Sequence, residues 1–417
     1  MRLLLTGALL LGLTAACGPA PPDTPDGGDA GAAPVTWYGD VLPVLEAHCL
    51  GCHRVGGASF PLGTYEEAAP LATTLADAAQ SGRMPPWPPS EACEPLAHAR
   101  TMSRAERATL RAWIRDGLQR GDPSTTQLAP PPPPGLPRTD LVLDPGVEYT
   151  PNPTEGDDDY RCFVVEPGLA QDRDMIGLEV VPGQPGLVHH LLAFQADPAL
   201  AREADDAEAG PGWTCFGGPG TKAGVLSTPE VIAAWAPGGS AVTLPDGTGI
   251  TLRAGKVVVL QVHYNLEFAP PAPDRTVVKV MLSEERVPRP AIFAPIADLG
   301  LYIPAGATGR EAGAVRTTNG EARIHGLFPH MHLLGRKIRV DLRPRDGSPR
   351  CLIDIPEWDF NWQGMYFFAD PSGIRVVPPD EVVLTCTYDN PGPDPVTWGD
   401  GSRDEMCLAY VYVTGTF

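Results

Sequence analysis

Two cysteines followed directly by a histidine form the first motif with chemical meaning. Cys49 and Cys52 are separated by two residues and His53 comes next, which is the C-x-x-C-H pattern of covalent c-type haem attachment. In this pattern the two thiols add to the haem vinyl groups, and the histidine binds the iron from one side. We therefore predict one haem c on these three residues. A zinc site or a disulfide between the two cysteines is the alternative interpretation.

A second iron ligand is expected further along the chain. Met84 is our prediction, because a thioether raises the potential of a haem and suits electron transfer. The alternatives are that His98 or Met102 binds the iron, or that the iron has five ligands. Residues 35–122 resemble small bacterial cytochrome c domains, in which the last amphipathic helix would place Trp113 against the haem.

Five further histidines fall in three short motifs. His189 and His190 are adjacent, His263 lies in a Gln-Val-His-Tyr run, and His330 and His332 are two residues apart. Imidazole suits copper and zinc alike. On a strand, residues two apart share a face, so His330 and His332 form a natural clip for a metal ion. Adjacent residues point to opposite faces, so joint ligation by His189 and His190 requires a strand end or a bulge.

These motifs, in this order, resemble those of the copper type II ascorbate-dependent monooxygenases, with a Glu-Met-Cys run that contains Met406 as the last of them. The resemblance extends over about residues 138–417. It implies an enzyme that binds two copper ions and hydroxylates a C–H bond with O2. It assigns the electron-transfer copper to His189, His190 and His263, and the oxygen-binding copper to His330, His332 and Met406. A thioether favours Cu(I), the state that must meet O2.

The resemblance also bears on the substrate. It implies that Tyr410 lies near the substrate, so the predicted catalytic residues are His330, His332, Met406 and Tyr410. The peptide-amidating branch of the family has an arginine and an asparagine where this chain has Phe328 and Leu408. We therefore expect a small, weakly polar substrate instead of a peptide. His325 is an alternative metal ligand, although its spacing does not match the family.

Six cysteines lie outside the haem motif and the N-terminal segment. The resemblance implies a disulfide between Cys386 and Cys407, which would help to position Met406. It implies a second disulfide between Cys162 and Cys215. Cys93 and Cys351 either pair across domains or stay free.

The predicted elements change from helical to β-rich along the chain. Helices are expected over 38–48 and 66–79, and a third begins at Ser103, where Glu106 completes a capping box. Pro130–Pro134 then form a stiff extended spacer. Short β segments follow, separated by proline and glycine. They lie at residues 175–181, 187–194, 257–264, 337–342, 382–388 and 407–413.

The predicted fold is a small all-α cytochrome c domain followed by two all-β, jelly-roll-like sandwich domains. A weakly marked boundary near residues 290–300 separates the two sandwiches. The predicted segments are a signal peptide (1–17), a flexible tether (18–34), the cytochrome c domain (35–122), a proline-rich linker (123–138), and the N-terminal (139–292) and C-terminal (293–417) copper monooxygenase domains.

The N-terminus predicts export. Arg2 precedes an apolar run over residues 3–13, and the small residues 14–16 lead to Cys17. They resemble a bacterial lipobox, with Cys17 as the lipidated residue; an ordinary signal peptide is the alternative. No other apolar run is long enough to span a bilayer. We predict a lipoprotein of the bacterial cell envelope, periplasmic or at the outer membrane, that meets the membrane only through its lipid.

The predicted function is a copper monooxygenase whose electrons arrive through the fused haem from an external donor. Animal members of the family take these electrons from ascorbate, and a tethered haem raises the local concentration of a donor. The net charge of −20 argues against nucleic acid as a partner. Two alternatives have other functions. One is a non-catalytic redox or copper-handling lipoprotein, and the other is an interaction module whose metals are structural.

Overall fold

A computed structural model describes most of the chain from residue 33 onward. The described residues are 33–55, 59–125, 135–153, 156–215, 219–220, 230–236, 241–267, 269–399 and 401–417. The predicted signal peptide with Cys17, nearly all of the tether, and the run Pro130–Pro134 lie outside them. Within the described residues, no helix is long and apolar enough to cross a membrane.

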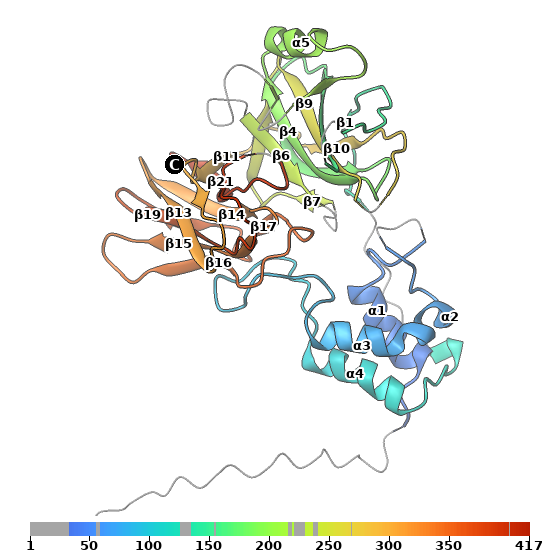
Figure 1. The fold of residues 1–417 in the computed structure, drawn as a ribbon. Helices are drawn as coiled ribbons and strands as arrows, with labels where there is room; N and C mark the ends of the chain where they lie inside the picture. Colours follow the sequence, from blue (N-terminus) through green and yellow to red (C-terminus); the bar gives the residue numbers. More distant parts are fainter. Residues whose placement is uncertain are drawn as a thin grey trace, which may run out of the picture. The chain divides into compact units, whose positions relative to one another are not determined.

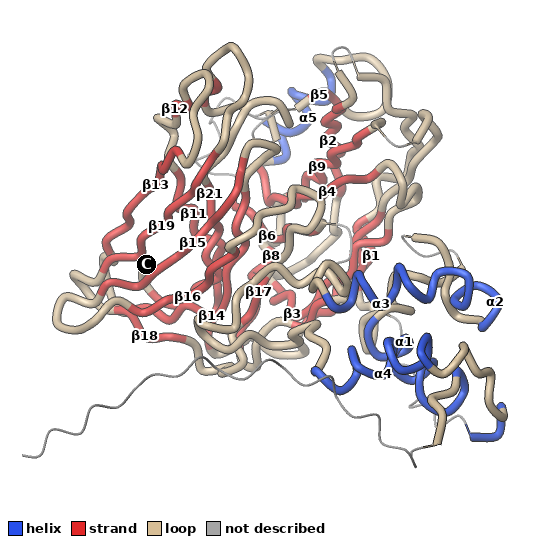
Figure 2. The backbone as a smooth tube through the Cα atoms, turned by 60° about the horizontal axis from the view of Figure 1, so that its bottom comes forward, coloured by secondary structure: helices blue, strands red, loops and turns tan. Residues whose placement is uncertain are grey.

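Short helices form the first described unit (Figure 2). They pack around a core that includes Trp37, Leu45, Met102 and Trp113. The expected helix over 66–79 is interrupted, because Pro70 cannot continue the hydrogen-bond ladder of an α-helix. The helical elements are η1 (Trp37–Val41), α1 (Leu42–His48), α2 (Tyr65–Ala68), η2 (Ala69–Leu71), α3 (Ala72–Gln80), α4 (Arg104–Arg115) and η3 (Pro123–Thr125).

The predicted capping box at the start of α4 is confirmed. The Ser103 hydroxyl accepts a hydrogen bond from the Glu106 N–H, and the Glu106 carboxylate accepts one from the Ser103 N–H. The same carboxylate lies 2.9 Å from Nε2 of His48 at the end of α1. Burial raises the pKa of Glu106, but the hydrogen bonds from His48 and Ser103 lower it more, to about 2 from an ordinary 4.5.

This contact predicts a pH-dependent contribution to stability. The pKa of Glu106 is lower in the folded state, so its charged form stabilises the helical unit above about pH 4.5, and this stabilisation is lost as the pH falls towards about 2. We expect Glu106→Gln to lower the thermal midpoint by a few degrees at pH 6 and to match the wild type near pH 2, measured by circular dichroism. Replacement of the exposed Glu91 with glutamine is the control. A difference in thermal midpoint between Glu106→Gln and the wild type that persists at pH 2 would contradict the role assigned to the Glu106 carboxylate.

Residues 87–97, which we call the strap, join the helical unit to the β-rich part. Cys93 forms a disulfide with Cys351, 258 residues away, so this pair spans two domains. The Trp87 ring packs edge-on against Tyr366, with centroids 5.4 Å apart. Backbone hydrogen bonds add to the attachment: Ser90 N–H to Asp354 O, Glu94 N–H to Cys351 O, Ala97 N–H to Phe367 O, and Ala369 N–H to Pro95 O.

A ten-stranded sheet runs through both predicted sandwich domains (Figure 1). Strand β11 crosses the expected boundary at residues 292/293 without a break, and it pairs with β21 at the end of the chain. In order, the strands are β1 (Leu141–Leu143), β10 (Val277–Leu282), β3 (Arg173–Val181), β8 (Thr248–Leu252), β11 (Arg289–Ala297), β21 (Leu408–Gly415), β14 (Ala322–His330) and β17 (Tyr366–Phe367), with β7 (Val242–Thr243) on β3 and β18 (Ile374–Val376) on β14.

Three smaller sheets and one further helix complete the fold. A five-stranded sheet contains β5 (Trp213–Thr214), β2 (Asp158–Val165), β9 (Val257–Asn265), β4 (Val188–Ala196) and β6 (Glu230–Trp235). A four-stranded sheet contains β13 (Arg310–Thr317), β19 (Glu381–Tyr388), β15 (Gly335–Arg343) and β16 (Arg350–Ile355). The remaining elements are β12 (Tyr302–Ile303), β20 (Val396–Thr397) and α5 (Pro198–Asp206).

The five-stranded sheet and the four-stranded sheet each pack on part of the ten-stranded sheet. The five-stranded sheet contributes Leu191 and Leu260 to a core that also contains Tyr412 of β21. The four-stranded sheet contributes Val340 to a second core, which contains Ala409, Val411 and Val413 of β21. Alternate residues of β21 therefore face different cores, as the two-residue period of a strand requires. The two predicted sandwiches are present, and they share one sheet.

Candidate metal centre

Three histidines converge in the five-stranded sheet. Nδ1 of His190 lies 3.3 Å from Nδ1 of His189 and 3.1 Å from Nδ1 of His263. Within the described part of the chain, this is the one group of three histidine, cysteine or acidic residues whose ligand atoms all lie within 4.8 Å of one another. Three imidazole nitrogens aimed at one point are a suitable donor set for a copper ion.

A strand irregularity lets adjacent histidines share this site. β4 pairs with β9 so that His190 lies opposite His263, and the register shifts between Val188 and His190. The extra residue turns the side chain of His189 back towards the face that His190 occupies. The strand is therefore irregular at the point where joint ligation by adjacent histidines would require a strand end or a bulge.

A half-buried carboxylate fixes the ring of His263. Its Nε2–H donates to Oδ1 of Asp158 at 2.9 Å, which leaves Nδ1 unprotonated towards the other two histidines. Burial raises the pKa of Asp158, but the hydrogen bonds from His263 and Asn265 bring it well below the usual value. Tyr160 stacks flat on His263, with ring centroids 4.0 Å apart. Asp158 thus takes the place of the outer carboxylate that commonly orients a metal-binding histidine.

The second histidine pair lies where β14 ends. Nε2 of His330 and Nε2 of His332 are 3.1 Å apart. His330 Nδ1–H donates to Oε1 of Gln363 at 2.6 Å, and His332 Nδ1–H donates to the carbonyl of Asp404 at 3.1 Å. Because each Nδ1 donates to an oxygen, each Nε2 is left with its lone pair free for a metal ion.

Burial keeps the imidazoles of both clusters neutral. It lowers the pKa of His189 to about 3 and that of His330 to about 4. It lowers the pKa values of His190 and His332 well below the ordinary value of 6.5. A neutral ring has the lone pair that a metal ion requires, so both clusters are ready to bind a metal near pH 7.

Glu405 connects the second pair with the predicted sulfur ligand. Its carboxylate, which is fully buried, accepts hydrogen bonds from the N–H groups of His332 (2.9 Å), Leu334 (2.6 Å) and Met406 (3.2 Å). Burial raises its pKa to about 7, although these N–H donors favour the charged form. One side chain thus ties together the backbones of two predicted ligands.

Strand pairing brings the predicted catalytic residues to one cavity. β14 and β21 pair so that His330 lies opposite Leu408 and Phe328 lies opposite Tyr410. The cavity has a volume of about 60 Å³, and it lies between the two histidine clusters. None of its described lining residues carries a carboxylate, an ammonium or a guanidinium group. They are Tyr160, His190, Leu192, Phe194, Trp235, Gln261, Phe328, His330, His332, Gln363, Met406, Leu408 and Tyr410.

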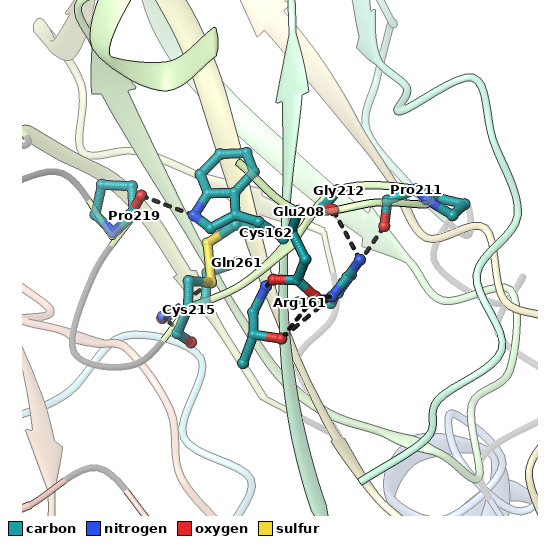
Figure 3. Close-up of a disulfide and its surroundings, with 10 residues drawn as sticks. Arg161, Cys162, Glu208, Pro211, Gly212, Cys215, Pro219 and Gln261 are labelled. Carbon is teal, nitrogen blue, oxygen red and sulfur yellow. Dashed lines mark hydrogen bonds and ion pairs between the residues drawn. A yellow bond between two sulfur atoms is a disulfide. The ribbon is translucent and has the colours of Figure 1, made fainter. Parts of the chain in front are cut away.

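The structure contains both disulfides that the family resemblance implies. Cys386 pairs with Cys407, and Cys162 pairs with Cys215. Figure 3 shows the second pair, with Gln261 beside it. On the same strand, the buried Arg161 forms an ion pair with Glu208 and donates to the carbonyls of Pro211 and Gly212. These contacts hold β5 against β2. They lie next to Tyr160, the residue that stacks on His263.

His325 belongs to neither cluster. Its Nδ1 bonds to the carbonyl of Pro371 at 3.2 Å, and its Nε2 lies 2.9 Å from the hydroxyl of Thr414. Both ring nitrogens therefore have protein partners. Sequence reasoning missed the supporting residues Asp158 and Gln363. Glu405 was visible only as part of the Glu-Met-Cys run.

The C-x-x-C-H motif lies directly after α1, and both of its thiols are free. Cys49 and Cys52 are the free cysteines of the described chain, so they form no disulfide with each other. With His53 they do not form a convergent group of three ligands like that in the five-stranded sheet. Nδ1 of His53 donates to the carbonyl of Phe60 at 3.0 Å, which leaves Nε2 as the available ligand atom. Met84 is half-buried, whereas Met102 lies in the core.

The protein is built of β-sandwiches, and residues of both histidine clusters line one cavity together with Met406. The first cluster could hold a metal ion. Sequence models of the N-terminal and C-terminal domains of the copper type II ascorbate-dependent monooxygenase family match residues 147–268 and 314–414. The two matches together cover more than half of the chain, so the chain belongs to this family.

Several proteins named as monooxygenases or hydroxylases are similar to this chain. DBH-like monooxygenase protein 1 of Homo sapiens is 25% identical over 303 residues, which are 66% of this chain and 47% of that protein. Dopamine beta-hydroxylase of Rattus norvegicus is 24% identical over 61% of this chain and 43% of its own length. Tyramine beta-hydroxylase of Caenorhabditis briggsae is 27% identical over 56% of this chain and 40% of its own length. The chain thus spans about half the length of these relatives.

Proposed function

We propose that this protein is a copper-dependent monooxygenase that hydroxylates a C–H bond with O2. The observation that carries the proposal is the pair of donor sets on either side of one cavity, with three Nδ1 atoms in the first and two Nε2 atoms in the second. His189, His190 and His263 would hold one copper ion, and His330, His332 and Met406 the other. When bound, the copper ions supply electron transfer at the first site and O2 activation at the second.

The protein's own residues prepare this chemistry. Burial keeps the imidazoles neutral, and Asp158, Gln363 and the carbonyl of Asp404 fix which ring nitrogen faces each metal ion. Leu192, Phe194, Phe328 and Leu408 form an apolar part of the cavity lining beside the imidazoles. Tyr410 lines the same cavity, and we propose that it contacts the substrate.

We propose that the substrate is small and weakly polar. Phe328 and Leu408 both line the cavity, and no charged group accompanies them among its described lining residues. A charged substrate would have to lose its water of hydration there without gaining a partner of opposite charge among the described lining residues, which is costly. A neutral aromatic or aliphatic compound would lose little by entering.

The test is metal analysis combined with oxygen uptake. We expect two copper ions per chain, and O2 consumption that requires a neutral organic substrate and yields a hydroxylated product. Removal of copper with a chelator should abolish the uptake, and added copper should restore it. Copper binding without substrate-dependent O2 uptake would instead indicate a redox or copper-handling protein. A lower thermal stability as the only effect of copper removal would indicate structural metals.

We further propose that the helical unit holds one haem c. Cys49 and Cys52 would attach it, with His53 and Met84 as axial ligands. The free thiols and the orientation of His53 fit such a group. Two apolar side chains near His53 are exposed, Val55 (87%) and Phe60 (54%), and a haem would cover this surface.

Bound haem would supply the electrons that ascorbate-type reductants supply elsewhere in the family, and an external donor would reduce it. An optical spectrum of a c-type haem with a methionine ligand would support the assignment. The reduced protein can be mixed with O2 in a stopped-flow instrument. Haem oxidation far slower than copper turnover would then refute the proposal that the haem supplies electrons to the copper bound by His189, His190 and His263.

We propose that the protein is an exported bacterial lipoprotein anchored through Cys17, in the periplasm or at the outer membrane. The signal-like N-terminus supports this proposal. The paired cysteines also agree with it, because disulfides persist mainly in oxidising compartments. Mass spectrometry of the mature N-terminus tests it: an unmodified Cys17 would exclude the anchor.

A further inference from the structure

One side of helix α4 carries a row of arginines. They follow one another at intervals of three or four residues, which places them along the same side of the helix. The opposite side is buried in the core of the helical unit through Leu110 and Trp113. The members of the row are Arg104, Arg107, Arg111 and Arg115, of which all but Arg107 are exposed.

Most of this positive charge is not neutralised by the protein itself. Among the described residues, Arg104, Arg107 and Arg111 form no ion pair, whereas Arg115 pairs with Asp116 at 2.8 Å. The chain as a whole has a net charge of −20, so a row of unpaired cations stands out from its surroundings. At an ionic strength of about 0.15 M, charges more than about 8 Å away are largely screened. A partner that touches this side of α4 therefore meets a positive surface.

The N-terminal segment joins the protein at the end of this helix. The N–H of Val35 donates to the carboxylate of Asp116 at 2.9 Å, and the N–H of Trp37 donates to the carbonyl of Gln119 at 2.8 Å. Asp116 directly follows the last residue of α4. The chain that leads back from Val35 to Cys17 therefore begins where the arginine row ends.

The length of this connection limits how far the row can lie from an anchored Cys17. Residues 18–34 separate Cys17 from Val35. Even a fully extended chain of this length spans at most about 60 Å. A lipid on Cys17 would thus keep the arginine row near a membrane surface, and such tethering raises the local concentration of the headgroups, so that a weak attraction is sufficient.

The chemistry of the row fits phosphate groups. Guanidinium groups bind phosphate oxygens through two parallel hydrogen bonds. Because the apolar side of α4 is buried in the protein, this helix meets a bilayer only through its charged side, at the level of the headgroups. We propose that the arginine row docks the helical unit on anionic phospholipids, as a second attachment beside the lipid. This inference rests on the proposed anchor at Cys17.

The test is sedimentation with lipid vesicles. The chain from Gly18 onward, made without a lipid, contains every described residue and measures the attachment through the protein surface alone. We expect it to bind vesicles of phosphatidylglycerol and phosphatidylcholine in about 0.1 M salt, and not to bind vesicles of pure phosphatidylcholine. Salt at about 1 M should release it, because the screening length falls from about 10 Å to about 3 Å.

A variant assigns the binding to the row. The combined changes Arg104→Gln, Arg111→Gln and Arg115→Gln should lower the binding constant about 100-fold, because each basic side chain near an anionic membrane contributes about fivefold. Glutamine is as good a helix former as arginine, and circular dichroism checks that the helices remain. The matched control replaces three exposed arginines outside the helical unit with glutamine and should bind like the wild type. They are Arg310, Arg343 and Arg345.

The possible results separate this inference from the proposed function. Equal binding to anionic and neutral vesicles, or an equal loss in the two triple variants, overturns the docking surface. A wild type that does not bind anionic vesicles also overturns it, and an acidic redox protein then becomes the partner to test. None of these results bears on the copper sites, which metal analysis tests separately. An unmodified Cys17 in the mature protein would exclude the anchor, and with it the role of the row as a second attachment.

Discussion

Replacing His263 with alanine is expected to reduce bound copper from two ions per chain to one and to lower hydroxylation at least about 100-fold. His263 is completely buried, and its Nδ1 is one of the three nitrogens that converge in the five-stranded sheet. Its removal leaves His189 and His190 as the remaining imidazoles of the site. It also leaves the carboxylate of Asp158 without the ring that now lies 2.9 Å away. Loss of an outer partner alone costs about 10–100-fold in metal affinity, and loss of a ligand should cost more.

The measurements are metal analysis of the purified variant and product formation under saturating O2. His325→Ala is the matched control, because His325 is also buried, and both of its ring nitrogens have partners away from the clusters. It should keep both copper ions. Retention of two tightly bound ions by His263→Ala, or loss of one by His325→Ala, would show that the ligands are wrongly assigned.

Replacing Glu405 with alanine is expected to lower the free energy of unfolding by about 3 kcal/mol or more, and to weaken copper binding at the second site. The backbone N–H groups of His332, Leu334 and Met406 would lose their acceptor inside the protein. Each buried donor left without a partner costs about 1–3 kcal/mol. The same change frees the backbones of two predicted ligands, so the second site should lose its geometry before the first.

Denaturant unfolding and copper titration measure the two effects. The exposed Glu311 on β13 is the control, and its replacement with alanine should change the free energy of unfolding by less than about 0.5 kcal/mol. If Glu405→Ala unfolds like the wild type, the buried carboxylate does not organise the site. If it is unstable but binds both copper ions normally, its role is limited to the fold.

Local sequence patterns predicted the elements and many of the candidate site residues. The capping box at Ser103 and Glu106 depends on residues three apart, and the structure contains it. The alternation of side chains along a strand predicted a strand end or a bulge at His189 and His190 if they bind one metal ion, and the structure has a register shift there. Recognising the family motifs added Met406 and two of the disulfides, and both disulfides are present. Each of these inferences depends either on residues close together in the sequence or on a motif whose partner residues are known from the family.

Other features required the tertiary structure because they join residues far apart in sequence. Asp158 and His263 are 105 residues apart, and the Cys93–Cys351 disulfide spans 258 residues. Phe360 and Gln363 belong to a segment with no recognisable motif, yet they contact both histidine clusters. The shared ten-stranded sheet likewise depends on which strands become neighbours.

The sequence by itself therefore determined the order of the elements, the metal-binding residue types and their grouping into short motifs. Only the tertiary structure decided which carboxylate supports which histidine, and how close the two clusters lie. The physical reason is that helix caps and strand alternation are set by neighbours along the chain. The contacts between carboxylates and histidines and the closeness of the two clusters are set instead by strand pairing and side-chain packing. No local pattern in the sequence encodes the partners in these contacts.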